Sequence, residues 1–292
     1  VLMPIFARAR LGHRLNLALL GSVIVGIVAL TTLAYVEDGA DPDFAAAVAK
    51  SDALSERMNA LVVAAHGIPA GGGLSLLRSD PMTQGPALFS THCSSCHRVD
   101  GHDGLGGLLT DDPAAADLAG FGSREWLTGL LDPERFATPE YFGGTQHVRG
   151  RMSRVVQRAI ASFGPEQVAE LGLVVKALSA EAALPRQAAA DSVDRAEIEE
   201  GGRLMATERM NCTRCHLFHG VNQELEGPQL TGWGSREWML GMLQNPGHVS
   251  FYGDSNDGMP AFGDDAILTE AQMGLIVDWL RQDWYEVEAG GR

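Results

Sequence analysis

The sequence predicts an all-α protein in which one N-terminal transmembrane helix is followed by two tandem helical domains. Three observations lead to this prediction: an uncharged apolar run over residues 15–35, two copies of a Cys-x-x-Cys-His pattern, and a duplicated segment that follows each copy. The 292 residues suffice for about two domains and an anchor. Glycine is abundant at 35 residues and aromatic residues make up only 7%. This composition fits loop-rich helical domains around a large cofactor better than a sheet protein.

The apolar run has the length of a membrane-spanning helix, which needs about 20 residues. Arg8, Arg10 and Arg14 precede it, and all 37 acidic residues of the chain lie after residue 36. The positive-inside rule therefore predicts a cytoplasmic N-terminus and places the remainder in the periplasm, anchored in the inner (cytoplasmic) membrane. A cleaved signal peptide is the alternative, but signal cores span about 7–15 residues and end at a small-x-small site. We therefore expect a retained, single-pass anchor in the lipid bilayer.

The charge balance bears on the partners. The formal net charge is −15, and every acidic residue belongs to the part after the anchor. Such a surface repels nucleic acid and anionic lipid and favours soluble partners with a basic face. Solubility alone would explain the same charge, so we expect no nucleic-acid partner and infer nothing more specific from it.

All four cysteines belong to two identical patterns. The residues concerned are Cys93, Cys96 and His97 in the first pattern and Cys212, Cys215 and His216 in the second. Cys-x-x-Cys-His is the attachment motif of c-type haem. Two thiols about one helical turn apart bond to the two vinyl groups of one haem, and the following histidine binds the iron. The sequence thus predicts two covalently bound haem c groups.

Two other chemistries share part of this pattern. A thioredoxin-like pair requires no histidine after the second cysteine, and a four-cysteine zinc site leaves both histidines without a role. Because the haem motifs use every cysteine, no disulfide and no cysteine-ligated iron–sulfur cluster is expected. This kind of haem attachment occurs outside the cytoplasm, in agreement with the predicted topology.

The chain contains an internal duplication. Residues 120–131 align with residues 232–243, and both contain Ser-Arg-Glu-Trp, in which serine is a typical helix N-cap. A further helix is predicted after each copy, beginning near Pro165 and Thr269. The predicted organisation has five parts: an N-terminus and anchor over 1–36, a helical connector over 37–80, domain 1 over 81–180, a linker over 181–194, and domain 2 over 195–292.

Methionine is the expected second axial ligand of the iron, because it suits electron transfer and raises the reduction potential. In domain 2, Met259 lies in a Gly/Pro-rich loop before the last helix. In domain 1, Met152 occupies the corresponding place in order, and His147 lies five residues earlier. We favour Met152 and keep His147 as the alternative.

A backbone carbonyl after each motif is expected to accept a hydrogen bond from the other ring nitrogen of the histidine. That bond fixes the orientation and the basicity of the ring. The segment 227–230, Gly-Pro-Gln-Leu, is the candidate for His216. The aligned segment 116–118 lacks the proline but still offers a carbonyl.

The two domains resemble class I cytochrome c domains, each with an N-terminal helix, the haem motif, a methionine loop and a C-terminal helix. The whole chain is similar to the diheme cytochrome c subunit of bacterial cytochrome bc complexes. The residues that carry this likeness are those at 10–16, 66–69, 77–81 and 141–145 together with the Gly-x-Gly-Ser-Arg-Glu-Trp repeat. The resemblance implies cytochrome b and a Rieske protein as partners and a soluble cytochrome c or a terminal oxidase as the electron acceptor.

Three functions remain open at this point. The first is an electron-transfer subunit of a quinol:cytochrome c oxidoreductase, with no substrate site of its own. The second is the diheme subunit of a cbb-type terminal oxidase, which the chain also resembles. The third is a diheme enzyme with one open haem, for which carbon monoxide binding to the reduced protein is the discriminating test.

Overall fold

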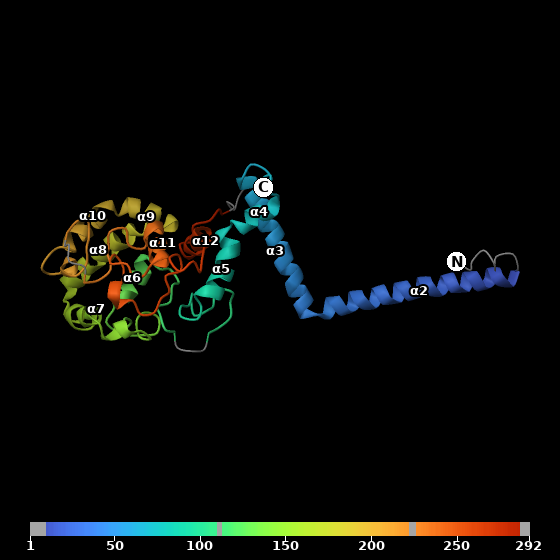
Figure 1. The fold of residues 1–292 in the computed structure, drawn as a ribbon, viewed down its shortest axis with the longest axis horizontal. Helices are drawn as coiled ribbons and strands as arrows, with labels where there is room; N and C mark the ends of the chain where they lie inside the picture. Colours follow the sequence, from blue (N-terminus) through green and yellow to red (C-terminus); the bar gives the residue numbers. More distant parts are fainter. Residues whose placement is uncertain (1–9, 110–112, 222–225, 287–292) are drawn as a thin grey trace. The chain divides into compact units, whose positions relative to one another are not determined.

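The computed structural model describes residues 10–109, 113–221 and 226–286. Within these ranges the chain forms helices, turns and a few isolated β-bridges, and no strand (Figure 1). The predicted all-α class is thereby confirmed. The chain divides into two compact units, Val1–Ile68 and Pro69–Arg292.

The first unit contains two helices, α2 (Arg10–Ala40) and α3 (Pro42–Ala64). The stretch Gly12–Ala40 contains an 18-residue window with a mean hydropathy of 2.4, none of which is buried, so its length and composition suit either a membrane span or a signal sequence. The helix continues past residue 36, where we expected the anchor to end, because no helix breaker precedes Pro42. Asp41 caps α3 by accepting a hydrogen bond from the backbone N–H of Asp43 at 2.9 Å.

The second unit contains two sets of corresponding helices. The first set is α5 (Pro81–His92), α6 (Arg124–Leu130) and α8 (Pro165–Glu181), and the second is α10 (Arg195–Leu204), α11 (Arg236–Gln244) and α12 (Glu270–Leu280). Shorter elements connect them: α4 (Gly73–Arg78), η1 (Gln146–Arg149), α7 (Arg151–Arg154), η2 (Val155–Ala159), η3 (Ile160–Ser162), η4 (Pro185–Gln187), α9 (Ala188–Val193), η5 (Cys212–Arg214) and η6 (Gly253–Ser255).

The predicted helix starts are present, and local chemistry explains them. Ser123 and Ser235 cap α6 and α11, each accepting a hydrogen bond from the N–H of the tryptophan three residues later, at 3.1 and 3.2 Å. Pro165 occupies the first turn of α8, and Thr269 forms a capping box with Gln272 at the start of α12.

The terminal helices of the two repeats pack across the repeats. α5, from the first repeat, packs against α12 of the second, while α10 of the second packs against α8 of the first. Both contacts depend on glycine: a Cβ at Gly85 would lie 2.2 Å from Trp279 Cβ, and one at Gly201 would lie 1.9 Å from the carbonyl oxygen of Leu173. α6 and α11, in contrast, pack against the C-terminal helices of their own repeats, α8 and α12.

The unit therefore has two lobes, each built from both repeats. We call the part with α6, α7, α8 and α10 the central lobe, and the part with α5, α11 and α12 the terminal lobe. The buried core of the central lobe consists of Trp126, Leu127, Leu131, Phe136, Tyr141, Val156, Val174, Val175, Leu178, Met205, Met210, Phe218, Leu230 and Trp233. The buried core of the terminal lobe consists of Phe89, Cys93, Met239, Leu243, Phe262, Leu268, Met273, Ile276 and Val277.

The chain passes between the lobes at two Gly-x-Gly segments that lie against each other. A Cβ at Gly234 would be 3.6 Å from Gly122 Cα, and Cβ atoms at Gly122 and Gly234 would lie 3.0 and 3.1 Å from Ala182 Cβ. Both glycines have positive φ, 85° and 72°, which glycine adopts at no steric cost. The hydroxyl of Ser179 donates to the carbonyl of Gly122 at 2.8 Å, and the guanidinium of Arg281 donates to that of Gly234 at 2.7 Å.

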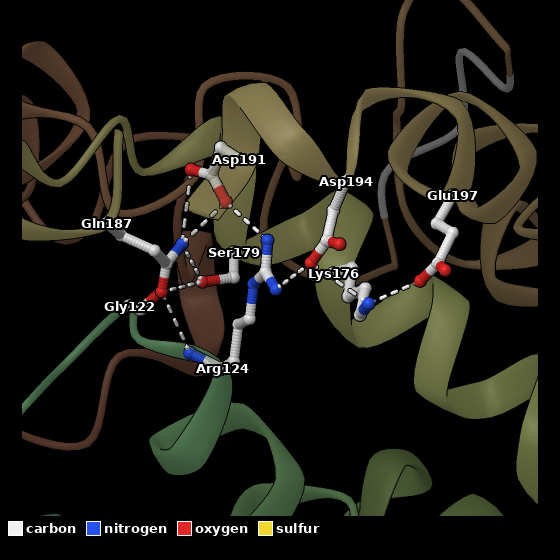
Figure 2. A network of polar contacts seen from close by, with 8 residues as sticks. All are labelled: Gly122, Arg124, Lys176, Ser179, Gln187, Asp191, Asp194 and Glu197. Carbon is white, nitrogen blue, oxygen red and sulfur yellow. Dashed lines mark hydrogen bonds and ion pairs between the residues drawn. The ribbon is translucent and has the colours of Figure 1, made fainter. Parts of the chain in front are cut away.

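The segment expected as a linker, 181–194, contains α9 and takes part in a polar network (Figure 2). Arg124, at the start of α6, pairs with Asp191 at 2.7 Å and also with Asp194, while Lys176 of α8 lies 3.0 Å from Asp194. Gln187 donates to the hydroxyl of Ser179 at 2.7 Å. These contacts join α6, α8, α9 and the start of α10 within the central lobe.

Candidate functional site

Each Cys-x-x-Cys-His motif forms one turn directly after an N-terminal helix or its extension. Cys93 caps α5, and the N–H of His97 donates to the carbonyl of Cys93 at 2.8 Å. In the second motif, Asn211 takes the left-handed conformation with φ 55° and starts the turn, in which the N–H of His216 donates to the carbonyl of Cys212 at 3.1 Å. The backbone thus brings the two thiols of each motif within one turn, as attachment to one haem requires.

The two histidines have the same orientation. Nδ1 of His97 lies 2.8 Å from the carbonyl oxygen of Ala116, and Nδ1 of His216 lies 2.7 Å from that of Pro228. Because a carbonyl only accepts hydrogen bonds, Nδ1 carries the proton in both rings and Nε2 keeps its lone pair. The predicted carbonyl partners are confirmed in both repeats, and Nε2 is the nitrogen left to bind a metal.

Burial keeps these groups neutral. It lowers the pKa of His97 and of His216, which opposes protonation of the ring, although the hydrogen bond to the carbonyl acts in the other direction. It also raises the pKa of the Cys93 thiol to about 12 and that of the Cys212 thiol to about 11. Neutral imidazole is the form that binds a metal.

The repeated Ser-Arg-Glu-Trp segments fix the histidine partners. Trp126 Nε1 donates to the carbonyl of Asp117 at 2.9 Å, and Trp238 Nε1 donates to that of Gln229 at 3.1 Å. These carbonyls belong to the residues directly after the ones that hold the histidines. Each tryptophan therefore holds the segment that orients an imidazole. The sequence signalled this role only by repeating the tryptophan at the same offset.

Four aromatic side chains join the two repeats beside these segments. The ring of Phe121 lies 4.9 Å from Trp126 and 4.8 Å from Trp233, measured between centroids, and Trp233 lies 5.9 Å from Trp238. Their contacts combine buried apolar area with favourable edge and tilted geometries. Phe121 and Trp233 are the middle residues of the two crossing Gly-x-Gly segments, so this aromatic cluster lies where the lobes meet.

The two candidate methionines lie in different lobes. Met259 packs against the core that contains Cys93, whereas Met152 packs against the central core, as does Cys212. This grouping is the reverse of the within-repeat pairing that we expected from the order of the motifs. The ring of His147 lies between those of Phe142, at 5.8 Å, and Tyr252, at 5.1 Å. Ligation by Met152, Met259 or His147 stays a prediction.

The residues present fit haem better than the alternatives. Each motif offers two free thiols and a partly buried imidazole with an available Nε2, and a candidate thioether packs against each of the two cores. No group of three or more His, Cys, Asp or Glu side chains suited to a metal ion occurs among the residues described. The hypothesis of a four-cysteine zinc site therefore gains no support from the residues described.

The family comparisons agree with this chemistry. A family described as "Cytochrome c" matches residues 82–171, and one described as "Cytochrome C oxidase, cbb3-type, subunit III" matches residues 196–280. Neither the curated proteins nor the solved structures give a match. Each family match contains one Cys-x-x-Cys-His motif and falls on one repeat. The chain therefore has two cytochrome c domains that imply binding of haem c and transfer of electrons, as expected of a diheme cytochrome c.

Proposed function

We propose that this chain is the membrane-anchored diheme electron-transfer subunit of a bc-type quinol:cytochrome c oxidoreductase. It receives electrons from a Rieske protein and passes them to a soluble cytochrome c or a terminal oxidase. The single observation that carries the redox part is the duplicated site, in which His97 and His216 are both partly buried and oriented by backbone carbonyls. The bc assignment rests on the sequence features at 10–16, 66–69, 77–81 and 141–145.

The protein's own contribution is to hold neutral ligands in fixed places. The haem iron, when bound, supplies reversible one-electron chemistry. The carbonyls of Ala116 and Pro228 fix the orientation of each imidazole through Nδ1 and raise the basicity of Nε2. Thioether ligation favours the reduced state, and Met152 and Met259 are the residues proposed for it. The aromatic cluster of Phe121, Trp126, Trp233 and Trp238 packs the two halves of the site against each other.

The topology completes the proposal. α2 contains the anchor, the arginines before the apolar run 15–35 stay in the cytoplasm, and the unit Pro69–Arg292 works in the periplasm. The surplus of acidic side chains after residue 36 steers a carrier with a basic face toward this unit, and salt weakens that attraction.

The diheme subunit of a cbb-type terminal oxidase is the second candidate. It is favoured by the family match over residues 196–280, whose description names subunit III of such an oxidase. The chemistry at the two motifs is the same in both candidates. They differ in the protein that receives the electron.

The test is to extract the chain from its native membrane in mild detergent and to identify the proteins that accompany it. The bc proposal predicts cytochrome b and a Rieske protein, and reduction of the c haems by quinol that a quinol-site inhibitor blocks. A copper–haem oxidase subunit in their place would establish the second candidate. A chain without such partners, whose reduced form binds carbon monoxide, would point instead to an open haem and to catalysis.

A further inference from the structure

The helix that carries each haem motif packs against the C-terminal helix of the other repeat. α5 leads into Cys93 and packs against α12, while α10 precedes Cys212 and packs against α8. The contacts are close enough to exclude a side chain at Gly85 and at Gly201. Each motif thus lies in a lobe whose C-terminal helix comes from the other repeat.

The segment before Met152 contacts the second repeat along its length. The backbone N–H of Gln146 donates to Asp257 Oδ2 at 2.8 Å, and the ring of His147 lies 5.1 Å from that of Tyr252. Arg151 forms an ion pair with Glu226, whose carboxylate also accepts from the Cys215 thiol at 3.5 Å. The residue next to Met152 is therefore linked through one carboxylate to the second haem motif.

Met259 has the complementary position. It packs against the terminal core, which contains Phe89 and Cys93 of the first repeat. Its backbone carbonyl accepts from the Asn256 side chain at 2.9 Å, which holds the loop that presents the thioether. Met152, in contrast, packs against the core that contains Met205 and Met210, as does Cys212.

We propose that each haem takes its two axial ligands from different repeats, His97 with Met259 and His216 with Met152. The proposal rests on the diheme electron-transfer function and is independent of which complex the chain serves. It makes each repeat incomplete by itself, because the imidazole and the thioether of one iron belong to different halves of the chain. The crossing Gly122 and Gly234 segments are where the chain leaves one haem site for the other.

The test uses full-length chains that keep one haem. In the double variant Cys93→Ala/Cys96→Ala only the second motif is loaded, and Met152→Ala or Met259→Ala is added to it. The proposal predicts that Met152→Ala removes the charge-transfer band of sulfur-ligated ferric haem and opens the ferrous haem to carbon monoxide. Met259→Ala leaves both signals as in the double variant. In the reciprocal background, Cys212→Ala/Cys215→Ala, the two methionines exchange roles.

The opposite pattern, in which Met259→Ala opens the second haem, would overturn the proposal. So would a chain in which neither methionine affects the remaining haem. The parent chain separates this failure from failure of the proposed function: two haems per chain with a sulfur-ligated spectrum uphold electron transfer, whatever the pairing. A parent without attached haem would remove the function itself.

A second measurement covers variants that do not fold with one haem. It uses the diheme chain and a thermodynamic cycle between Gly85→Ala and Trp279→Ala, with Gly85→Ala and Ala177→Gly as the matched control cycle. If the helices pack across the repeats, the Tm shift of Gly85→Ala/Trp279→Ala should differ from the sum of the two single shifts, because the two residues are in contact. The Tm shift of the control double variant should equal the sum of its single shifts. Additivity between Gly85 and Trp279 with coupling between Gly85 and Ala177 would restore the within-repeat arrangement.

Discussion

Gly85 is the residue at which α5 and α12 approach most closely, and replacing it by alanine tests that contact. The added Cβ would lie 2.2 Å from Trp279 Cβ, 2.5 Å from Trp279 Cγ and 3.1 Å from the carbonyl oxygen of Leu275. Carbon atoms in contact are ordinarily about 3.5–4.0 Å apart. The two helices must therefore separate by about 1.5 Å, since neither Cβ can rotate away.

The expected cost follows from two opposing contributions. Overpacking of this kind destabilises by about 1–3 kcal/mol. Alanine in place of glycine inside a helix raises the free energy of unfolding by roughly 0.5–1 kcal/mol. The free energy of unfolding should therefore fall by up to about 2.5 kcal/mol, and by about 1 kcal/mol at the middle of both ranges. At Gly172 of α8 a Cβ would meet nothing within 4 Å, so Gly172→Ala isolates the helix contribution and should raise stability by roughly 0.5–1 kcal/mol.

Urea unfolding followed by far-ultraviolet circular dichroism measures both variants against the parent chain. The reasoning predicts opposite signs for the same chemical change at two helical glycines. If Gly85→Ala is as stable as Gly172→Ala, α5 does not lie against Trp279, and the cross-repeat packing is refuted. Unchanged m-values for both variants would show that the unfolded states remain comparable.

Three further predictions concern the polar contacts that hold the lobes. Arg124→Ala should lower the free energy of unfolding by about 1 kcal/mol. The control Arg203→Ala removes the exposed i,i+3 pair with Glu200 and should change this free energy by less than about 0.5 kcal/mol. Equal losses of stability in urea titrations would contradict the role of the network. Hydrogen bonds from Lys176 and Arg124 hold the pKa of Asp194 below its ordinary value of 3.8, so its stabilisation is complete above that pH and is lost as the pH falls through the lower folded-state pKa. Asp194→Asn should therefore flatten the acid limb of Tm against pH, and an unchanged limb would show that Asp194 is not the group responsible. Arg281→Met leaves the carbonyls of Ala182, Ala183 and Gly234 without their donor and should destabilise the chain by about 2–3 kcal/mol. Ser179→Ala removes the hydrogen bond to the Gly122 carbonyl and should cost about 1 kcal/mol. The reverse order of the two Tm values would contradict this account.

Local signals made much of the fold predictable. Ser123 and Ser235 each cap a helix, and the Cys-x-x-Cys-His turns carry their own spacing and their own histidine. The carbonyls that orient the imidazoles could also be anticipated, because a metal-binding histidine needs a partner for its second nitrogen. These features depend on residues within about 20 positions of one another.

The pairing of helices could not be predicted in the same way. α5 and α10 each place a glycine against a partner helix. In α12 and in α8 alike, the atoms nearest to that glycine include a backbone carbonyl oxygen and a side-chain Cβ from residues four positions apart. A duplicated pattern gives both C-terminal helices the same kind of face. Periodicity therefore identifies the helices and leaves open which repeat supplies each partner, and with it the methionine for each haem.

One difference between the repeats bears on that choice. In the second repeat, Arg236 at the start of α11 pairs with Asp278 of α12 at 2.6 Å. By the contacts that the two C-terminal helices make, the corresponding position in α8 is Lys176, which has the same charge as Arg124. At this position of its own C-terminal helix, Arg124 therefore meets no carboxylate.

The carboxylates for Arg124 come from the segment that leads into the second repeat. Asp191 and Asp194 pair with Arg124, and Lys176 is satisfied by Asp194 and by Glu197 of α10 (Figure 2). Two like charges on α6 and α8 are thus compensated by carboxylates of α9 and of the start of α10, which pack beside them. With α10 held there, its place against α12 is left to α5, whose Gly85 accepts Trp279. A single lysine in place of an aspartate gives an electrostatic reason for the repeats to exchange their terminal helices, and for each haem site to be assembled from both.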